Sequence, residues 1–497
     1  GDVYKRQIFI SAAVLLSGCN DFLDKVPDNR TELDNAKTIS ELLVSAYPNR
    51  AYVEFCEAMS DNAEDKGVAI QSDRAVEESF KWKDVSYTLQ DSPTGYWSSC
   101  YEAIAAANHA LEALDKLGGM DTQAQRGEAL VARAYCHFML VNIFAQHYDP
   151  ATADKDLGVP YVTEPETVVL KDYKRESVAK VYELIEQDLK EGLSLIQDHT
   201  YTVPKYHFTK AAAHAFASRF YLYKGNWDKV IEHANAVFGT GDVASQLRDW
   251  ITHGQLSTSV REKEYTSAEQ PSILLLASSL TKIARYQEFY RYGFNSSLES
   301  KLFRSAKVNA IGLPWAYVLE KWQADKGDPI TMLKWKEYFQ QIGINATTGY
   351  LYAMIPILTK DEVLLNRIEA YAMKKRYTEA LADINAFYSK RTLSYDVSKN
   401  VKAEDITKFY ADYAPLNPFY EMDTEQAAFV QCAVELRRVE FVMEGMRWFD
   451  VKRFGIEIVH YPYGMPSQKD VLVKRDLRRA VQVPSDAIAY GLTPNPR

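Results

Sequence analysis

Two arginines and two glutamates near the C-terminus form the charge pattern with the clearest chemical meaning. Arg437, Glu440, Glu444 and Arg447 occur at i, i+3, i+7 and i+10, so on a helix they form one stripe. Paired carboxylates can act as acid and base when their surroundings separate their pKa values. A structural ion network is the simpler interpretation, because each glutamate has an arginine three residues away and a buried charge needs a partner. We predict such a network on one docked helix over residues 436–455.

Aromatic residues in irregular stretches offer a second kind of chemistry. From about residue 239 to residue 356 the helical periodicity weakens, and Ser, Thr, Gly, Asn and Pro separate short apolar pieces. A flat ring can cover the apolar face of a pyranose while polar side chains bind its hydroxyl groups. The rings with loop context and polar neighbours, for which we expect partial exposure and ligand contact, are Trp82, Tyr290, Tyr292, Trp315 and Trp322. We assign Trp97, Trp335 and Trp448 to core packing.

The sequence predicts a predominantly helical scaffold to hold these side chains. Residues 213–238 read as a helix, a break at Gly225 and Asn226, and a second amphipathic helix. Residues 364–387 repeat this pattern, and both stretches resemble tetratricopeptide units, which bury their faces by stacking. Further helices are expected at residues 96–117, 125–145 and 176–195, and a strand at residues 272–277. We predict a scaffold of about four helix pairs.

Composition limits the classes of function. The chain has 497 residues, a length that exceeds one compact core, so two lobes or an extended array are expected. The formal net charge is -9 and basic residues occur in isolated pairs, which argues against a nucleic-acid partner. The HExxH, GxSxG, Walker A and GxGxxG motifs are absent. With 67 Asp and Glu residues, the sequence leaves a glycosidase pair open but selects none.

The cysteines and histidines give no sign of a metal site. Cys56, Cys100, Cys136 and Cys432 show no Cys-x-x-Cys spacing, which argues against structural zinc or a redox pair. The alanine-rich helical context of Cys100 and Cys136 indicates buried thiols. A disulfide between two of the four stays open outside the cytoplasm. We expect no metal and no cofactor.

The N-terminal residues have the order of a signal peptide. Lys5 and Arg6 precede an apolar run over residues 8–16 that is too short to span a bilayer. Leu-Ser-Gly-Cys follows at once and ends at Cys19. This order predicts cleavage after residue 18 and acylation of Cys19, which would anchor the chain to a membrane through lipid. The alternative is an ordinary secretory leader with a chance cysteine.

Several motifs resemble the RagB/SusD family of Bacteroidetes. The order of charges in residues 436–455, with Glu-Gly, Arg-Trp-Phe-Asp and Arg-Phe-Gly, is similar to the C-terminal hallmark of that family. Leu-Ser-Gly-Cys resembles a bacterial lipobox. Residues 97–111 resemble the early Trp, Tyr, Ile and Ala-Asn pattern of the family, and residues 356–370 resemble its Glu-x-x-Leu-x-x-x-Glu-Ala helix. The resemblance therefore extends over nearly the whole chain.

This resemblance implies a SusD-like helical scaffold and a non-catalytic lipoprotein at the outer membrane. Its members bind a glycan at the cell surface and form a lid on a SusC-like TonB-dependent transporter, so a glycan and such a transporter are the implied partners. Two alternatives stay open: a surface protein that binds peptides, as some relatives do, and a surface glycosidase. The expected regions are a signal peptide (1–18), a tether (19–36), an N-terminal helical region (37–240) and a C-terminal region with the ligand loops (241–497).

Overall fold

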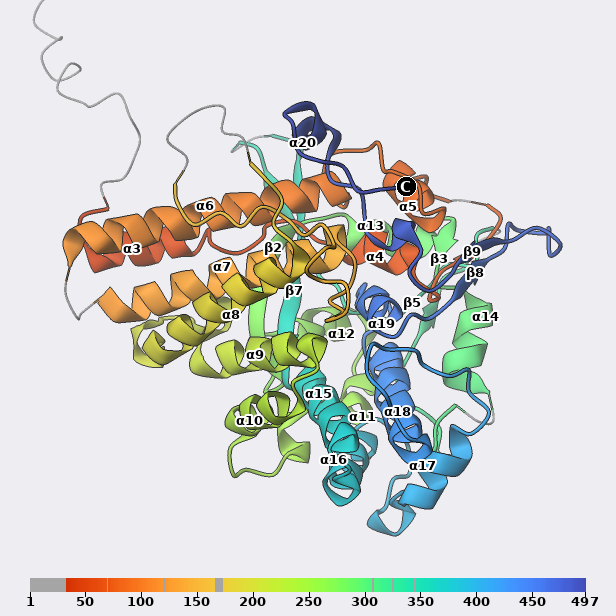
Figure 1. Cartoon of the computed structure of the whole chain (residues 1–497). Coiled ribbons are helices and arrows are strands. Elements are labelled where there is room, and N and C mark those ends of the chain that lie inside the picture. The colour runs from red at the N-terminus through yellow and green to blue at the C-terminus, as the bar shows by residue number, and fades with distance from the viewer. Residues whose placement is uncertain are drawn as a thin grey trace, which may run out of the picture.

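The computed structural model of the chain describes residues 33–68, 70–118, 122–165, 173–305, 308–323, 326–343 and 346–497. Helices dominate these residues (Figure 1), so the predicted mainly α fold is confirmed. The predicted leader and the predicted lipidation site, Cys19, lie outside the described residues. Among the helices of the described part, none has both the length and the apolar character needed to cross a bilayer.

Three long helices of the first half lie side by side: α6 (Pro93–Leu117), α7 (Gln123–Phe144) and α8 (Val178–Leu195). They match three predicted helices. The Ser92 hydroxyl accepts a hydrogen bond from the first turn of α6, and a proline occupies its first position, as expected at a helix start. Helix α7 is buried over nearly its whole surface. The shorter elements here are α3 (Ala36–Leu43), α4 (Val53–Met59), β1 (Glu64–Asp65), α5 (Arg74–Phe80), η2 (Asp198–Thr200) and η3 (Pro204–Tyr206).

Two helix pairs follow the predicted repeat. The first is α9 (Lys210–Lys224) with α10 (Trp227–Phe238), and the second is α15 (Lys360–Met373) with α16 (Tyr377–Ser389). Gly225 ends α9 in the left-handed conformation with φ 73°, which glycine adopts without strain. The predicted break is therefore confirmed. Helix α10 also packs on α15, so the two pairs stack although they are far apart in the sequence.

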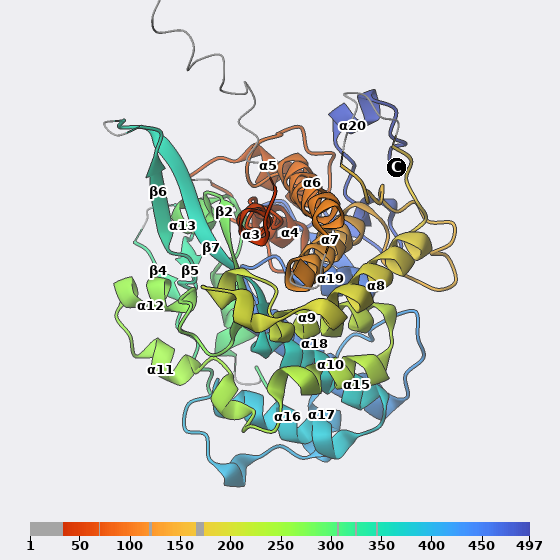
Figure 2. The same cartoon turned by 90° about the vertical axis from the view of Figure 1, so that its left-hand side faces the viewer.

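The insertion between the pairs contains a three-stranded antiparallel sheet. Its order is β2 (Ile273–Leu280), β7 (Gly349–Thr359) and β6 (Glu337–Gln341), which confirms the predicted strand. Figure 2 shows β6 and β7 extending as a hairpin beyond the helical body. The other elements of the insertion are η4 (Ala244–Gln246), α11 (Trp250–Gly254), α12 (Thr258–Tyr265), α13 (Ile283–Tyr286), η5 (Gln287–Phe289), β3 (Tyr292–Gly293), α14 (Ser296–Glu299), the π-helical turn η6 (Ser300–Arg304), β4 (Glu320–Lys321) and β5 (Ile330–Thr331).

The single helix predicted over residues 436–455 is wrong in one respect. The structure has two helices here, α18 (Thr424–Glu440) and α19 (Arg447–Arg453). Met443 and Gly445 lie between them with φ of 67° and 73°. A right-handed helix cannot pass through left-handed residues, so the chain turns between the two segments.

Helix α4 fixes this turn. The Glu57 carboxylate accepts hydrogen bonds from the N–H groups of Met443 at 2.7 Å and Gly445 at 2.9 Å. A Cβ atom on Gly445 would lie 2.9 Å from the carbonyl oxygen of Val53, so glycine is needed for the close approach. The remaining elements are η7 (Val397–Lys399), α17 (Ala403–Phe409), β8 (Ile458–His460), β9 (Asp470–Leu472), η8 (Leu477–Arg479) and α20 (Ser485–Ala489).

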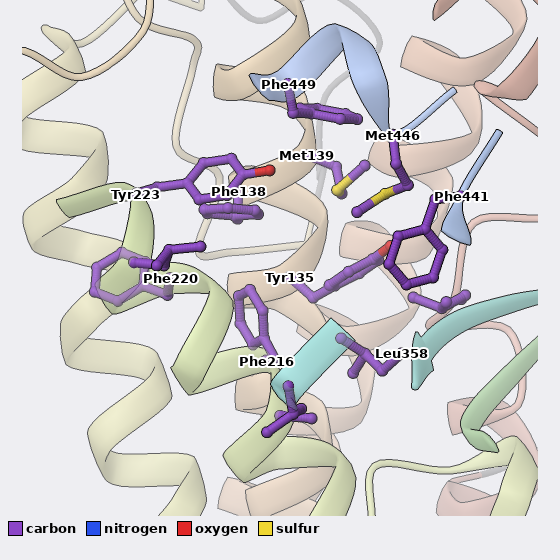
Figure 3. Packing of buried hydrophobic residues seen from close by; sticks show 14 of the residues in the cluster. Tyr135, Phe138, Met139, Phe216, Phe220, Tyr223, Leu358, Phe441, Met446 and Phe449 are labelled. Atoms are coloured by element: carbon purple, nitrogen blue, oxygen red, sulfur yellow. The ribbon is translucent and has the colours of Figure 1, made fainter. Parts of the chain in front are cut away.

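The main core joins the first half of the chain to its C-terminal helices. Figure 3 shows Tyr135 and Phe138 of α7, Phe216 and Phe220 of α9, and Phe449 of α19 packed together. The three tryptophans assigned to the core, Trp97, Trp335 and Trp448, are all buried. The four cysteines of the described residues, Cys56, Cys100, Cys136 and Cys432, are buried free thiols, so the possible disulfide among them is not formed.

Candidate functional site

Four segments distant in sequence meet on one side of the molecule, and we call their joint surface the loop face. It comprises residues 60–68 with 70–92, 283–305, 320–323 with 326–331, and 458–472. Strand β1 pairs with β3, and the Asp65 carboxylate accepts a hydrogen bond from the Tyr463 N–H group at 3.1 Å. Gly327 lies against Val68. The loop face is thus one continuous surface built by all four segments.

Three of the predicted ligand residues lie beneath this surface. Trp82 is 5% exposed; its Nε1–H donates to the last carbonyl of α4 at 2.9 Å, and its ring stacks on His460 with centroids 4.4 Å apart. Tyr292 stacks on Phe80 at 4.5 Å, and Tyr290 packs in the same small cluster. These rings join the segments to one another and present no face to solvent.

The expected partial exposure is therefore wrong for Trp82, Tyr290, Tyr292 and Trp315, and it holds for Trp322. Trp315 belongs to the main core, where its ring centroid lies 5.4 Å from that of Tyr317. The physical reason is that a large ring gains most by burial, whatever the polarity of its sequence neighbours.

Trp322 is 40% exposed and stands on the β4–β5 hairpin of the loop face. Beside it lies Glu288, whose pKa is raised by burial to about 7 even though Lys66 and a hydrogen bond from the Trp322 side chain lower it. The Lys66 ammonium group donates to the Glu288 carbonyl oxygen at 2.8 Å. Burial lowers the pKa of Lys66 to about 8. An exposed ring therefore adjoins a carboxyl group that can exchange hydrogen bonds with a hydroxyl group, and the buried Lys66 binds the backbone of Glu288.

Two further exposed rings on the loop face were not predicted from the sequence. Tyr463 is 64% exposed, and neighbouring Tyr461 is 49% exposed. Tyr463 covers Gly67, since a Cβ atom there would lie 2.6 Å from its ring. Tyr463 thus contacts Gly67, whose chain neighbour Lys66 binds Glu288, and Glu288 lies beside Trp322. The run Tyr-Pro-Tyr-Gly-Met-Pro at residues 461–466 was an available signal, since Pro and Gly mark a turn and turns expose their rings.

The charged residues of the C-terminal motif are buried, as expected, but their partners differ from those predicted. Glu440 accepts hydrogen bonds from Trp250 at 3.0 Å and Tyr317 at 2.6 Å, and it pairs with Arg391 at 3.1 Å. Glu444 pairs with Lys334 at 2.5 Å. The two glutamates therefore bind side chains of the insertion and Arg391, which follows α16, rather than the arginines of their own segment. The break between α18 and α19 separates Arg447 from the glutamates, whereas Arg437 shares α18 with Glu440 and binds other partners.

The two arginines bind other parts of the chain. Arg437 pairs with Glu369 of α15 at 3.1 Å and with Asp450 at 3.2 Å. Arg447 pairs with Asp61 at 2.8 Å. Asp61 belongs to the first segment of the loop face, so this ion pair connects the C-terminal helices to it. The C-terminal motif therefore holds the first segment of the loop face in place, and its charged side chains are buried.

Chemically, the loop face offers exposed rings with adjacent hydrogen-bonding groups. A search of the described residues finds no group of three or more His, Cys, Asp or Glu side chains placed to hold a metal ion. The geometry suits a neutral ligand with an apolar face and a polar edge.

A family model described as "Starch-binding associating with outer membrane", of the SusD-like type, matches residues 21–222. Among curated proteins none matches the chain significantly.

Solved structures resemble nearly the whole chain. A SusD superfamily protein from Bacteroides thetaiotaomicron aligns with a TM-score of 0.63 at 18% identity, covering 94% of this chain and 100% of that one. A putative sugar binding protein from Bacteroides vulgatus gives 0.65 at 20% identity, covering 93% and 97%. A SusD-like carbohydrate binding protein from Bacteroides vulgatus gives 0.63 at 16% identity, covering 92% and 96%. The fold of the chain is the fold of these proteins.

Proposed function

We propose that this chain is a SusD-like protein, as the family model over residues 21–222 and the shared fold support, and that it captures oligosaccharide or polysaccharide at the cell surface through its loop face. In this proposal Trp322 and Tyr463 cover the apolar faces of sugar rings. Glu288, held in place by Lys66, binds hydroxyl groups between them. The protein delivers the glycan and does not cleave it.

The observation that carries this proposal is the continuity from Trp322 through Glu288, Lys66 and its chain neighbour Gly67 to Tyr463. If each stacked ring buries about 50 to 80 Å² of apolar surface, the transfer free energy is roughly 1 to 2 kcal/mol per ring. The loss of translational and rotational freedom on association opposes this gain. Two stacked rings are therefore expected to give only weak affinity. Weak binding suits capture followed by release.

Calorimetry with a panel of neutral polysaccharides tests the proposal. Trp322→Ala and Tyr463→Ala are each expected to weaken binding about tenfold, which equals roughly 1.4 kcal/mol. Tyr490→Ala is the matched control, because Tyr490 is 73% exposed on another part of the chain. Thermal unfolding of each variant should match the parent. Unchanged affinity in both loop-face variants would place the site elsewhere.

We further propose that a SusC-like TonB-dependent transporter receives the glycan and that Cys19 carries the lipid anchor, with residues 1–18 as leader and 19–36 as tether. The Leu-Ser-Gly-Cys motif supports the anchor. Cys19→Ala should move the protein from the membrane fraction to the soluble fraction and abolish palmitate labelling. Co-purification with the product of a neighbouring transporter gene tests the partner, and uptake of labelled glycan should fall when the lipoprotein is deleted.

One observation favours a second candidate function, a surface glycosidase. Burial raises the pKa of Glu288 to about 7, whereas hydrogen bonds from Ser296 lower the pKa of Asp328 despite its partial burial. Carboxyl groups with separated pKa values are a feature of glycosidases. Incubation with the bound polysaccharide distinguishes the two functions: release of shorter products that Glu288→Gln abolishes would establish hydrolysis.

A further inference from the structure

A cavity of about 170 Å³ lies where the C-terminal end of α7 approaches the segments that follow α19. Its walls come from residues 146–156, 417–419, 452–455 and 474–479. They carry five Lys or Arg side chains and two Asp side chains. The volume is below the roughly 300 to 1,000 Å³ of pockets for drug-sized ligands, so it admits one small ligand or one end group.

Lys452 is a buried wall residue whose amine binds neutral acceptors. It is 7% exposed, and its ammonium group donates to the carbonyl oxygens of Asn142 at 2.5 Å and Ala145 at 2.6 Å. These acceptors lie at the C-terminal end of α7, where the helix dipole favours a cation. Within the described ranges no carboxylate pairs with Lys452. Burial accordingly lowers the pKa of Lys452 to about 7.

Arg479 repeats this arrangement. It is 2% exposed, and its guanidinium group donates to the carbonyl oxygens of Val451 at 2.7 Å, Ile456 at 2.5 Å and Val473 at 2.8 Å. These acceptors are neutral backbone groups, and in the part of the chain that the structure describes Arg479 forms no ion pair. Burial lowers the pKa of Arg479 to about 10. Two buried basic side chains without a carboxylate partner among the described residues therefore lie at one cavity, and an anion bound there would favour their charged forms.

The other wall residues leave part of this charge uncompensated. Arg475 is paired with Asp149, but Lys474 binds only the neutral side chain of Asn417 among the described residues. Phe419 adds an apolar surface beside the cations. The cavity therefore combines excess positive charge with one aromatic wall.

We propose that this cavity binds a compact oxyanion, namely the carboxylate, sulfate or phosphate group of a small ligand such as an acidic sugar. The oxyanion faces Lys452 and Arg479 at the back and Lys474 at the mouth, and a sugar ring attached to it rests against Phe419. This inference is independent of glycan binding at the loop face.

Calorimetry of the full mature chain at low ionic strength tests this site with four probes: sodium glucuronate, sulfate, phosphate and glucose. Glucuronate is expected to bind, glucose is not, and added salt should weaken the binding by screening. Binding of sulfate or phosphate without glucuronate would support the oxyanion site and identify free inorganic anions as its ligands. Failure of all three anions to bind would overturn the proposal.

Two variants locate the binding. Asn417→Asp keeps the size of the side chain and places a carboxylate against Lys474, so affinity should fall about tenfold, or roughly 1.4 kcal/mol. Lys474→Gln removes one exposed cation and should weaken binding about two- to fivefold. Lys37→Gln on α3 is the matched control, since its side chain is 86% exposed. Equal anion affinity in all of these folded variants would contradict the site.

The readouts separate this site from the loop face. Trp322→Ala should keep anion affinity, whereas Asn417→Asp should keep affinity for a neutral polysaccharide. Anion binding that disappears in Trp322→Ala would assign the anion to the loop face and overturn the cavity proposal.

Discussion

The buried ion network of the C-terminal helices and the exposed rings of the loop face reverse the usual places of charged and apolar side chains. Glu440 and Arg391 are 1% and 0% exposed, whereas Trp322 and Tyr463 are 40% and 64% exposed. Each buried charge has several partners from distant segments. Each exposed ring stands on a hairpin turn and has an open face.

This contrast indicates that the ion network stabilises the fold and the exposed rings bind ligand. Buried charges are expensive unless paired, so the network fixes the relative positions of the insertion, α15 and α18. Exposed rings on a surface need no such support, and they remain available to a ligand. Arg447 and Asp61 connect the two regions at 2.8 Å, so damage to the network would reach the loop face only through the fold.

Glu440→Ala should give the largest effect. It leaves Arg391 and two hydrogen-bond donors without their central acceptor, and loss of one partner of a buried ion pair costs about 3 to 5 kcal/mol. Denaturant unfolding measures this loss. The exposed Glu404, with a side chain 79% exposed, is the control, and Glu404→Ala should change stability by less than about 0.5 kcal/mol. A stable Glu440→Ala protein that binds no glycan would show that Glu440 serves ligand binding rather than stability.

The contribution of Glu440 should also appear in the free energy of unfolding measured as the pH is lowered. Burial raises the pKa of Glu440. Attraction to Arg391 and hydrogen bonds from Arg391, Trp250 and Tyr317 have the larger, opposite effect, so the pKa is lowered to about 2. A group with a lowered folded-state pKa stabilises the fold above its unfolded value, near 4.5, and loses this contribution as the pH falls towards 2. The loss amounts to roughly 3 kcal/mol. Glu440→Gln should flatten this part of the stability profile; an unchanged profile would show that Glu440 is not charged in the fold.

The sequence was sufficient to predict the scaffold because periodicity and helix ends are local signals. The break at Gly225 and the strand over residues 272–277 follow from nearest neighbours in the chain. The break between α18 and α19 could not be predicted in this way. It depends on Glu57 and Val53, nearly 400 positions earlier, which hold Met443 and Gly445 in place.

The candidate site was predictable in kind but not residue by residue. Loop context identified Trp322, yet the same criterion selected Trp82, which lies against His460. Whether a loop ring is covered depends on which distant segment packs over it, and a single sequence does not contain that information. The same limit applies to the charge partners, since Lys334 and Glu444 are more than a hundred positions apart.

Trp82→Ala tests whether a buried ring of the loop face behaves like the ion network. Removal of its stacking on His460 and of its hydrogen bond should cost about 3 kcal/mol of stability. Trp322→Ala should leave stability within about 0.5 kcal/mol. Thermal unfolding of the two variants, with glycan affinity measured well below the transition, separates the roles. A stable Trp82→Ala protein with lowered affinity would return Trp82 to the ligand site.

Tyr350→Ala should give the smallest effect and defines the edge of the site. Tyr350 is 53% exposed on the β6–β7 hairpin, opposite Gln340, and this hairpin stands away from the helical body in Figure 2. Because this hairpin is not part of the proposed glycan site between Trp322 and Tyr463, loss of the ring should change glycan affinity less than twofold, about 0.4 kcal/mol. Calorimetry beside Trp322→Ala provides the comparison. A tenfold loss in Tyr350→Ala with none in Trp322→Ala would move the glycan from the loop face to the hairpin, because exposure alone would then decide which rings bind.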